Sequence, residues 1–79
     1  MERVQWQDRI FVQPDLHHGD PCIRGTRVPV SIILGSLADG MTASEILAAY
    51  PQLTTDDVRA CLAYAAEAIK HEIMAPLPA

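Results

Sequence analysis

A short device for starting helices occurs twice between residues 41 and 62, and it constrains the fold more than any other feature of the chain. In "MTASEILAAYPQLTTDDVRACL", Thr42 and Glu45 have the spacing of a capping box, in which each side chain binds the other residue's backbone N–H. Thr54 and Asp57 repeat that spacing further along. Apolar pairs bracket both boxes like hydrophobic staples: Met41 with Ile46, and Leu53 with Val58. The stretch therefore predicts two helices joined by a tight turn.

The ends of these two helices can also be read from the sequence. The first is expected to stop at Tyr50, because Pro51 cannot continue it. The second is expected over about residues 55–73. Its apolar stripe at helical spacing comprises Val58, Leu62, Ala65, Ala66, Ile69 and Ile73. That stripe is longer than two short helices can cover, so the C-terminal turns are expected to meet a partner.

A further helix is predicted upstream of these two. Pro29 suits a first helical turn, where its missing N–H costs little, and Gly40 suits the C-terminal cap. Apolar residues recur between them at helical spacing: Val30, Ile33, Leu34, Leu37 and Ala38. Gly35 interrupts this helix, where it either lowers local stability or lets another backbone come close.

The N-terminal part of the chain has the pattern of short strands. Residues 9–13, "RIFVQ", form a β-branched and aromatic run that predicts a strand. Residues 21–30, "PCIRGTRVPV", predict a hairpin with Gly25 at the first central position of a two-residue type II′ turn. Arg24 and Arg27 would lie beside that turn, with their side chains free to reach outward.

Together these elements predict a mainly α domain, in which a three-helix, helix-turn-helix-like (winged-helix-like) unit follows short N-terminal β-strands. Residues 1–29 would hold the strands and the arginine hairpin, residues 30–74 the three helices, and residues 75–79 an extended tail. A core of this size rarely supplies more than ~3–5 kcal/mol. A homodimer, or a complex with another protein, is therefore expected.

Charge is distributed unevenly along the chain, whose formal net charge is −4. The positive and negative residues of the first 29 positions cancel. Residues 30–79 contain only Arg59 and Lys70 as cations. The acids of the same part are Asp39, Glu45, Asp56, Asp57, Glu67 and Glu72. The helices therefore carry the whole negative balance, which opposes a broad contact with nucleic-acid phosphates.

Two further features bear on the compartment. Cys22 and Cys61 are the only cysteines and form no C-x-x-C pair, and nothing upstream resembles a secretory signal. Reduced thiols in the cytoplasm are therefore expected. No apolar run approaches the ~18 residues of a membrane span, so no membrane association is expected.

Over roughly residues 7–69 the sequence resembles domain-of-unknown-function family 433. The matching positions are Pro21, Ile23-Arg24-Gly25-Thr26-Arg27, Pro29-Val30, Gly40-Met41, Glu45-Ile46, Tyr50-Pro51-Leu53-Thr54, Val58 and Leu62-Ala63-Tyr64-Ala65. The resemblance implies a winged or truncated helix-turn-helix fold and an antitoxin encoded beside a PIN-like nuclease toxin. The chain departs from the family at His18-Gly19-Asp20, where a Gly-Gly pair followed by Lys or Arg is common. A positive charge is thus missing beside the arginine hairpin.

The arginine hairpin has three possible roles. The acidic, metal-binding cleft of a PIN-like nuclease, which the resemblance implies, would pair its carboxylates with Arg24 and Arg27. The same two residues would otherwise hold a DNA phosphate, with Thr26 donating a further hydrogen bond. In the third role they pair within the fold, with Asp15, Asp20 or a helix C-terminus.

The last helix offers a second candidate surface. Its outward side would carry Thr55, Asp56, Arg59, Ala60 and Ala63. Of these only Arg59 suits a contact with guanine, so DNA binding would rest on Thr55 and Arg59 of this helix together with Arg27. The aromatic ring of Tyr64 lies off the apolar stripe and is expected to contact a dimer mate or partner.

No catalytic or metal site is predicted. His17, His18 and Cys22 lie close in sequence, but adjacent histidines point apart and no fourth ligand is present for tetrahedral zinc. No nucleophile–base pair, phosphate-binding loop or carboxylate cluster occurs, so the chain is expected to be a non-enzyme without cofactors. Trp6 and Phe11 are expected to anchor the N-terminal segment to the core.

The expected function is that of an antitoxin-like protein that binds a PIN-like nuclease toxin, with repression of its own operon through operator DNA as a secondary role. Two alternatives stay open. One is a DNA-binding transcriptional regulator without a toxin partner. The other is a structural protein-interaction module.

Overall fold

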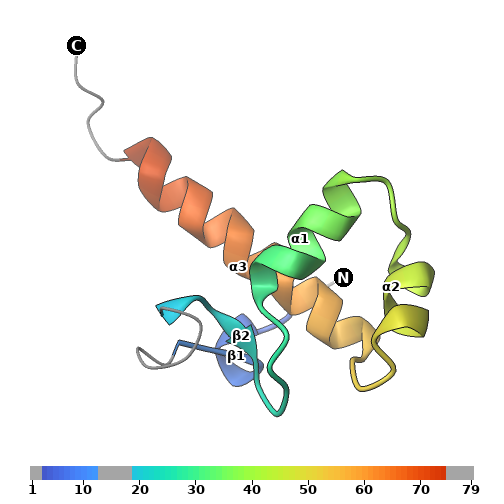
Figure 1. Cartoon of the computed structure of the whole chain (residues 1–79). Coiled ribbons are helices and arrows are strands. Elements are labelled where there is room, and N and C mark those ends of the chain that lie inside the picture. The colour runs from blue at the N-terminus through green and yellow to red at the C-terminus, as the bar shows by residue number, and fades with distance from the viewer. Residues whose placement is uncertain (1–2, 13–18, 75–79) are drawn as a thin grey trace.

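The computed structural model describes residues 3–12 and 19–74, the last four of them by their backbone alone. The elements are a 3-10 turn η1 (Trp6–Asp8), strands β1 (Ile10–Phe11) and β2 (Cys22–Ile23), and helices α1 (Val30–Ala38), α2 (Ala43–Ala49) and α3 (Thr55–Met74). Figure 1 shows α3 as the long axis, with α1 crossing it and α2 beside its first turns. The mainly α fold with helix-turn-helix-like order and short N-terminal strands is confirmed. The predicted tail, residues 75–79, lies outside the described residues.

Both capping boxes form as predicted. In α2 the Thr42 hydroxyl accepts from the Glu45 backbone N–H at 3.1 Å, and the Glu45 carboxylate accepts from the Thr42 N–H at 2.9 Å. In α3 the same exchange joins Thr54 and Asp57, at 3.2 and 2.9 Å. Each exchange satisfies two backbone donors that the start of a helix leaves without partners. The two boxes therefore fix where α2 and α3 begin.

The predicted glycine cap ends α1. Gly40 has a φ of +102°, which a residue with a Cβ rarely adopts. Its N–H donates to Leu37 at 3.1 Å and the N–H of Met41 donates to Ser36 at 3.0 Å, the paired bonds of a Schellman motif. Within α1, Gly35 is exposed and no described atom lies within 4 Å of where its Cβ would be. The close backbone approach considered for Gly35 is thus not made by the described part of this chain.

The N-terminal strands are shorter than predicted and the turn of the hairpin differs. β1 pairs antiparallel with β2 in the register Ile10 to Ile23 and Phe11 to Cys22. The hairpin that follows β2 is closed by the Ile23 N–H donating to Val28 at 3.0 Å. Gly25, with a φ of +82°, is the third rather than the second residue of its turn. That position requires positive φ in a type II turn, so the predicted type II′ turn is wrong.

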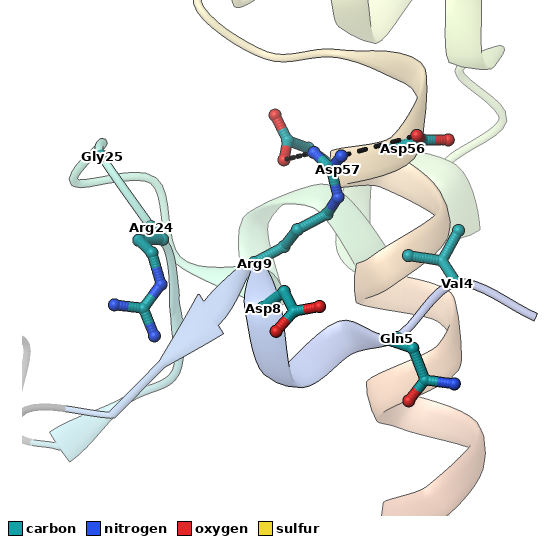
Figure 2. A pocket seen from close by; sticks show the side chains of 8 residues that line it. All are labelled: Val4, Gln5, Asp8, Arg9, Arg24, Gly25, Asp56 and Asp57. Carbon is teal, nitrogen blue, oxygen red and sulfur yellow. Dashed lines mark hydrogen bonds and ion pairs between the residues drawn. The ribbon is translucent and has the colours of Figure 1, made fainter.

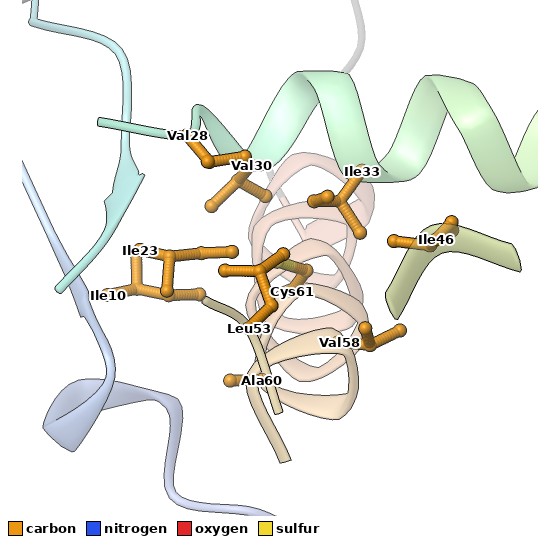
Figure 3. Packing of buried hydrophobic residues seen from close by; sticks show 10 residues of the cluster. All are labelled: Ile10, Ile23, Val28, Val30, Ile33, Ile46, Leu53, Val58, Ala60 and Cys61. Carbon is orange, nitrogen blue, oxygen red and sulfur yellow. The ribbon is translucent and has the colours of Figure 1, made fainter. Parts of the chain in front are cut away.

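The core lies where the two strands, α1 and α2 meet the first half of α3 (Figure 3). Its buried residues are Ile10, Ile23, Val28, Val30, Ile33, Ile46, Leu53, Val58, Ala60 and Cys61. The side chains are small or branched, as expected for closely packed short elements. Cys22 and Cys61 are both buried and free, in agreement with the predicted thiols.

The buried face of α3 differs from the predicted stripe. Val58 is buried, but Leu62 and Ile69 are 49% and 53% exposed and Ala66 is also exposed. The face that packs instead includes Ala60, Cys61 and Ala63. Ala60 and Cys61 belong to the core cluster, and η1 contacts α3 on the face that carries Tyr64 and Glu67. The expectation of uncovered apolar C-terminal turns nevertheless agrees with the exposure of Ile69, whereas the side chain of Ile73 lies outside the described residues.

Candidate functional site

The loop that carries Arg24 and Arg27, residues 23–28 and here named the arginine turn, is locked by short hydrogen bonds. The Thr26 hydroxyl donates to the Ile23 carbonyl at 2.8 Å and accepts from the Val28 N–H at 3.1 Å. The Thr26 N–H also donates to Ile23, at 3.1 Å. The hydroxyl proton of Thr26 is therefore used inside the turn, and its role there is structural.

The two guanidinium groups of the arginine turn face solvent. Arg24 and Arg27 are both exposed, and no carboxylate in residues 3–12 or 19–70 lies within ion-pair distance of either. Arg24 lies over the ring of Phe11, with its guanidinium carbon 5.9 Å from the ring centroid. Pairing with Asp20 is not formed, and Asp15 lies outside the described residues. The cation–π contact orients Arg24 without neutralising it.

A shallow groove of about 550 Å³ separates the arginine turn from the first turn of α3 (Figure 2). Its lining residues are Val4, Gln5, Asp8, Arg9, Arg24, Gly25, Asp56 and Asp57. Figure 2 shows Arg9 reaching toward the two aspartates of α3, while Arg24 stands on the opposite side of the groove. The groove is thus lined by two guanidinium groups. That of Arg9 is ion-paired with the aspartates of α3, and that of Arg24 has no ion pair within the described residues.

Arg9 is the residue that the sequence analysis missed. Its Nη1 lies 3.1 Å from Asp57 Oδ1 and its Nη2 lies 3.5 Å from Asp56 Oδ2. Its Nη1 also donates to the Thr54 hydroxyl at 3.5 Å. Arg9 therefore ties the end of the N-terminal segment to the start of α3. No local pattern predicts this contact, because its partners lie 47 and 48 positions away.

The outward face predicted for DNA reading is partly covered. Thr55 is exposed and Arg59 is half-buried, with its Nη1 3.7 Å from Asp56 Oδ1. Ala60 and Ala63 are 0% and 5% exposed, so their predicted outward position is wrong. Ala60 is part of the core cluster. At this end of α3 the accessible charged side chains are therefore those of Arg59 and the neighbouring Asp56.

Tyr64 lies off the predicted stripe, on a half-buried face of α3 that packs against the N-terminal segment, and its contact with a dimer mate or partner stays a prediction. Its ring meets the edge of Trp6, with centroids 4.9 Å apart and planes at 88°. The Trp6 indole N–H donates to the Glu67 carboxylate. Trp6 thus anchors the N-terminal segment as predicted. Phe11 is half-buried outside the core cluster, under Arg24, so its predicted role as a core anchor is wrong.

Both cysteine thiols have raised pKa values. Burial, with the nearby charge of Asp57, raises the pKa of the Cys61 thiol to about 12. Burial and then the charge of Asp20 raise the pKa of Cys22. Both therefore stay protonated near neutral pH. The hydrogen bonds from Thr42 lower the pKa of Glu45, which fits its capping role.

The described residues contain no group of three or more His, Cys, Asp or Glu side chains arranged to hold a metal ion. Cys22 is buried, and His17 and His18 lie outside the described residues. None of the described helices has the length and apolar character needed to cross a membrane.

Comparison with known proteins places the chain beside proteins of unknown function. The family model described as "Protein of unknown function (DUF433)" matches residues 10–65. A crystal structure of a DUF433 member protein from Anabaena variabilis superposes with a TM-score of 0.72 and 35% identity, covering 87% of this chain and 71% of that one.

One curated relative is also similar. The uncharacterized protein y4eO of Sinorhizobium fredii is 40% identical over 52 residues, which are 66% of this chain and 24% of the relative. The chain therefore spans about a quarter of the length of that relative.

Proposed function

The chain belongs to the DUF433 family, and we propose that it acts in the cytoplasm as an antitoxin-like protein that binds a PIN-like nuclease through the arginine turn. It is a binding protein in this proposal and not an enzyme. The observation that carries the proposal is the pair Arg24 and Arg27, exposed on a locked turn with no carboxylate of the described residues beside them.

Two features favour a protein carboxylate as the counterpart of these arginines. A guanidinium presents a planar fork that matches a carboxylate with two parallel hydrogen bonds. The turn is held by Thr26 and by the Arg24 N–H, which donates to the Arg9 carbonyl at 2.6 Å. Little backbone freedom is then lost when a partner binds. The nuclease, with its acidic metal-binding cleft, comes from what the family resemblance implies.

DNA binding is the secondary role in this proposal. The first turn of α3 presents Asp56 next to Arg59, and phosphates repel that aspartate. Ala60 and Ala63, which would approach bases in a DNA-reading helix, are buried. Operator binding would therefore depend on Arg27 and its neighbour Arg24, and it would be weakened strongly by salt.

The test is co-expression of the chain with the product of the adjacent gene, followed by copurification and a titration of the purified pair. Replacing Arg24 and Arg27 together by alanine is expected to weaken binding by at least about 100-fold, because charge-assisted bonds contribute about 1.5–3 kcal/mol each. The thermal midpoint is expected to stay within a few degrees of the wild type. Analytical ultracentrifugation of the free chain from the same preparation tests whether it also forms the homodimer expected from its small core.

The matched control replaces both arginines by lysine, which keeps the charge but removes the fork. An intermediate loss of affinity is expected from this variant. If the alanine variant lost stability while its affinity stayed intact, the arginines would be structural and the proposal wrong. Binding to the promoter fragment alone, abolished by salt, would favour the DNA-binding regulator instead.

A further inference from the structure

The second half of α3 exposes an apolar ridge formed by Leu62, Ala66 and Ile69, which we name the α3 ridge. Leu62 and Ile69 expose 49% and 53% of their surface, and beyond Glu67 the described side chains Ala68, Ile69 and Lys70 are all exposed. Figure 1 shows this part of α3 extending past the other elements. The described core packs against the first half of α3 and leaves the ridge bare.

The spacing of the α3 ridge is that of a helix–helix seam. Its residues follow one another at intervals of four and three, the alternation found along the contact line of paired helices. The small side chain of Ala66 lies between two large ones, so the ridge has a central dip into which a side chain of a second helix fits. The ridge is narrow and contains no aromatic residue, which suits a helix better than a lipid surface.

Two of the three charged side chains along one border of the ridge are positive, those of Arg3 and Lys70, and the third is Glu67. Arg3, Ala66 and Lys70 line a common hollow of about 290 Å³, together with Glu67. Glu67 accepts a hydrogen bond from Trp6. Arg3 and Lys70 are exposed, and no carboxylate in residues 3–12 or 19–70 lies within ion-pair distance of them. The complement of this border is a row of acidic side chains.

A second copy of the chain fits the ridge less well. In a symmetric antiparallel pair centred on Ala66, positions equally far from the centre meet, so Lys70 of one copy would lie beside Leu62 of the other. The positive side chains of the border would then gain no acidic counterpart from the second copy. The ridge also presents far fewer residues than the ~20–30 per side of a stable interface.

We propose that the α3 ridge docks an amphipathic helix of another protein, with acidic residues beside its apolar stripe. The proposal stands on exposure, spacing and charge, and it rests on the proposed function only in taking this helix to belong to the partner that the arginine turn binds. The two surfaces would then share one partner, and together they would approach the size of a stable interface.

The test uses the full chain and a designed helical peptide of about 21 residues, with leucine and isoleucine at alternating intervals of three and four and glutamate on both flanks. A second peptide has lysine in place of every glutamate. Binding is measured by fluorescence anisotropy. We expect the acidic peptide to bind the wild-type chain at least about tenfold more tightly than the basic peptide.

Leu62→Ser with Ile69→Gln is expected to weaken binding of the acidic peptide by at least about tenfold. Ile32→Gln is the matched control, because Ile32 is 45% exposed on α1, outside the ridge. It is expected to leave binding within about twofold. Lys70→Glu is expected to reduce the preference for the acidic peptide.

Several results would overturn the proposal: no binding, equal binding of both peptides, or equal losses from the ridge and control variants. A dimer that dissociates in Leu62→Ser with Ile69→Gln would assign the ridge to a second copy. Binding only to anionic vesicles would assign it to lipid. Because the peptide assay needs no nuclease, it distinguishes failure of this proposal from failure of the nuclease proposal.

Discussion

The first half of α3, residues 55–63, and the second half, residues 64–70, differ in what holds them. The first half starts with a capping box, is tied to Arg9 by two ion pairs and buries Val58 and Cys61 in the core. The second half is covered on one side, where Trp6 meets Tyr64, and is bare elsewhere. One continuous helix thus combines a structural base with a projecting end that is available for contact.

Thiol labelling sharpens this comparison and has the largest expected effect. At about pH 8, iodoacetamide should modify a thiol introduced by Ala66→Cys about 1,000-fold faster than Cys61. The thiolate fraction falls about tenfold for each unit by which the pKa rises, and the pKa of Cys61 rises from 9.0 to about 12. Peptide mass spectrometry locates each label. Equal labelling at both positions would mean that the first half of α3 opens as readily as the second.

The raised pKa of Cys61 also gives a pH dependence with a definite sign. The unfolded thiol ionises near pH 9.0, whereas the folded one stays protonated up to about 12. The folded chain therefore holds more protons in this window, and its stability should fall as the pH rises from 9 toward 12. Cys61→Ala should remove that component of the alkaline loss, as measured by urea unfolding at a series of pH values.

Shortening one apolar side chain in each half of α3 should show how much each half contributes to the free energy of unfolding. Val58→Ala removes a side chain that is 3% exposed, and it should cost about 1.5–3 kcal/mol of unfolding free energy. Ile69→Ala, in a half-exposed position, should change that free energy by less than about 0.5 kcal/mol. Chemical denaturation of both variants gives the comparison. Similar losses would show that the projecting end of α3 is packed in solution.

The smallest expected difference is between two substitutions at the start of α3. Asp57→Ala removes the carboxylate half of the capping box and the closer Arg9 ion pair, and should cost about 1–2 kcal/mol. Asp56→Ala is the matched control, because its side chain is 51% exposed and its ion pairs are longer. That change should cost less than about 0.5 kcal/mol. A larger loss of unfolding free energy from Asp56→Ala would mean that the ion pair of Arg9 with Asp56, rather than that with Asp57, stabilises the start of α3.

The features predicted correctly from the sequence are those that depend on residues close together in the chain. Both capping boxes and the Gly40 cap were correct, because each depends on residues only a few positions apart. Two features were missed: the burial of the α3 face that carries Ala60 and Ala63, and the ion pairs of Arg9 with the start of α3. Both depend on where segments distant in the sequence pack. Alanine is compatible with either a buried or an exposed helix position, so Ala60 and Ala63 carried no signal of their burial.

The candidate site divides in the same way. The exposed position of Arg24 and Arg27 followed from a glycine-containing turn, which could be recognised without knowledge of the rest of the fold. The groove between that turn and α3 required the three-dimensional arrangement, since its lining residues come from three separate parts of the chain. The contact of Tyr64 with Trp6 was missed because this aromatic neighbour is near the opposite end of the sequence.

The hydrogen bonds made by Thr26 have an evolutionary consequence. They fix the backbone between Ile23 and Val28 without using the side chain of either arginine. Positions 24 and 27 are therefore free to change residue type while the scaffold keeps its shape. A lineage of such chains can acquire a new binding preference by exchanging two side chains, and a protein engineer can graft a different pair there with little risk to folding.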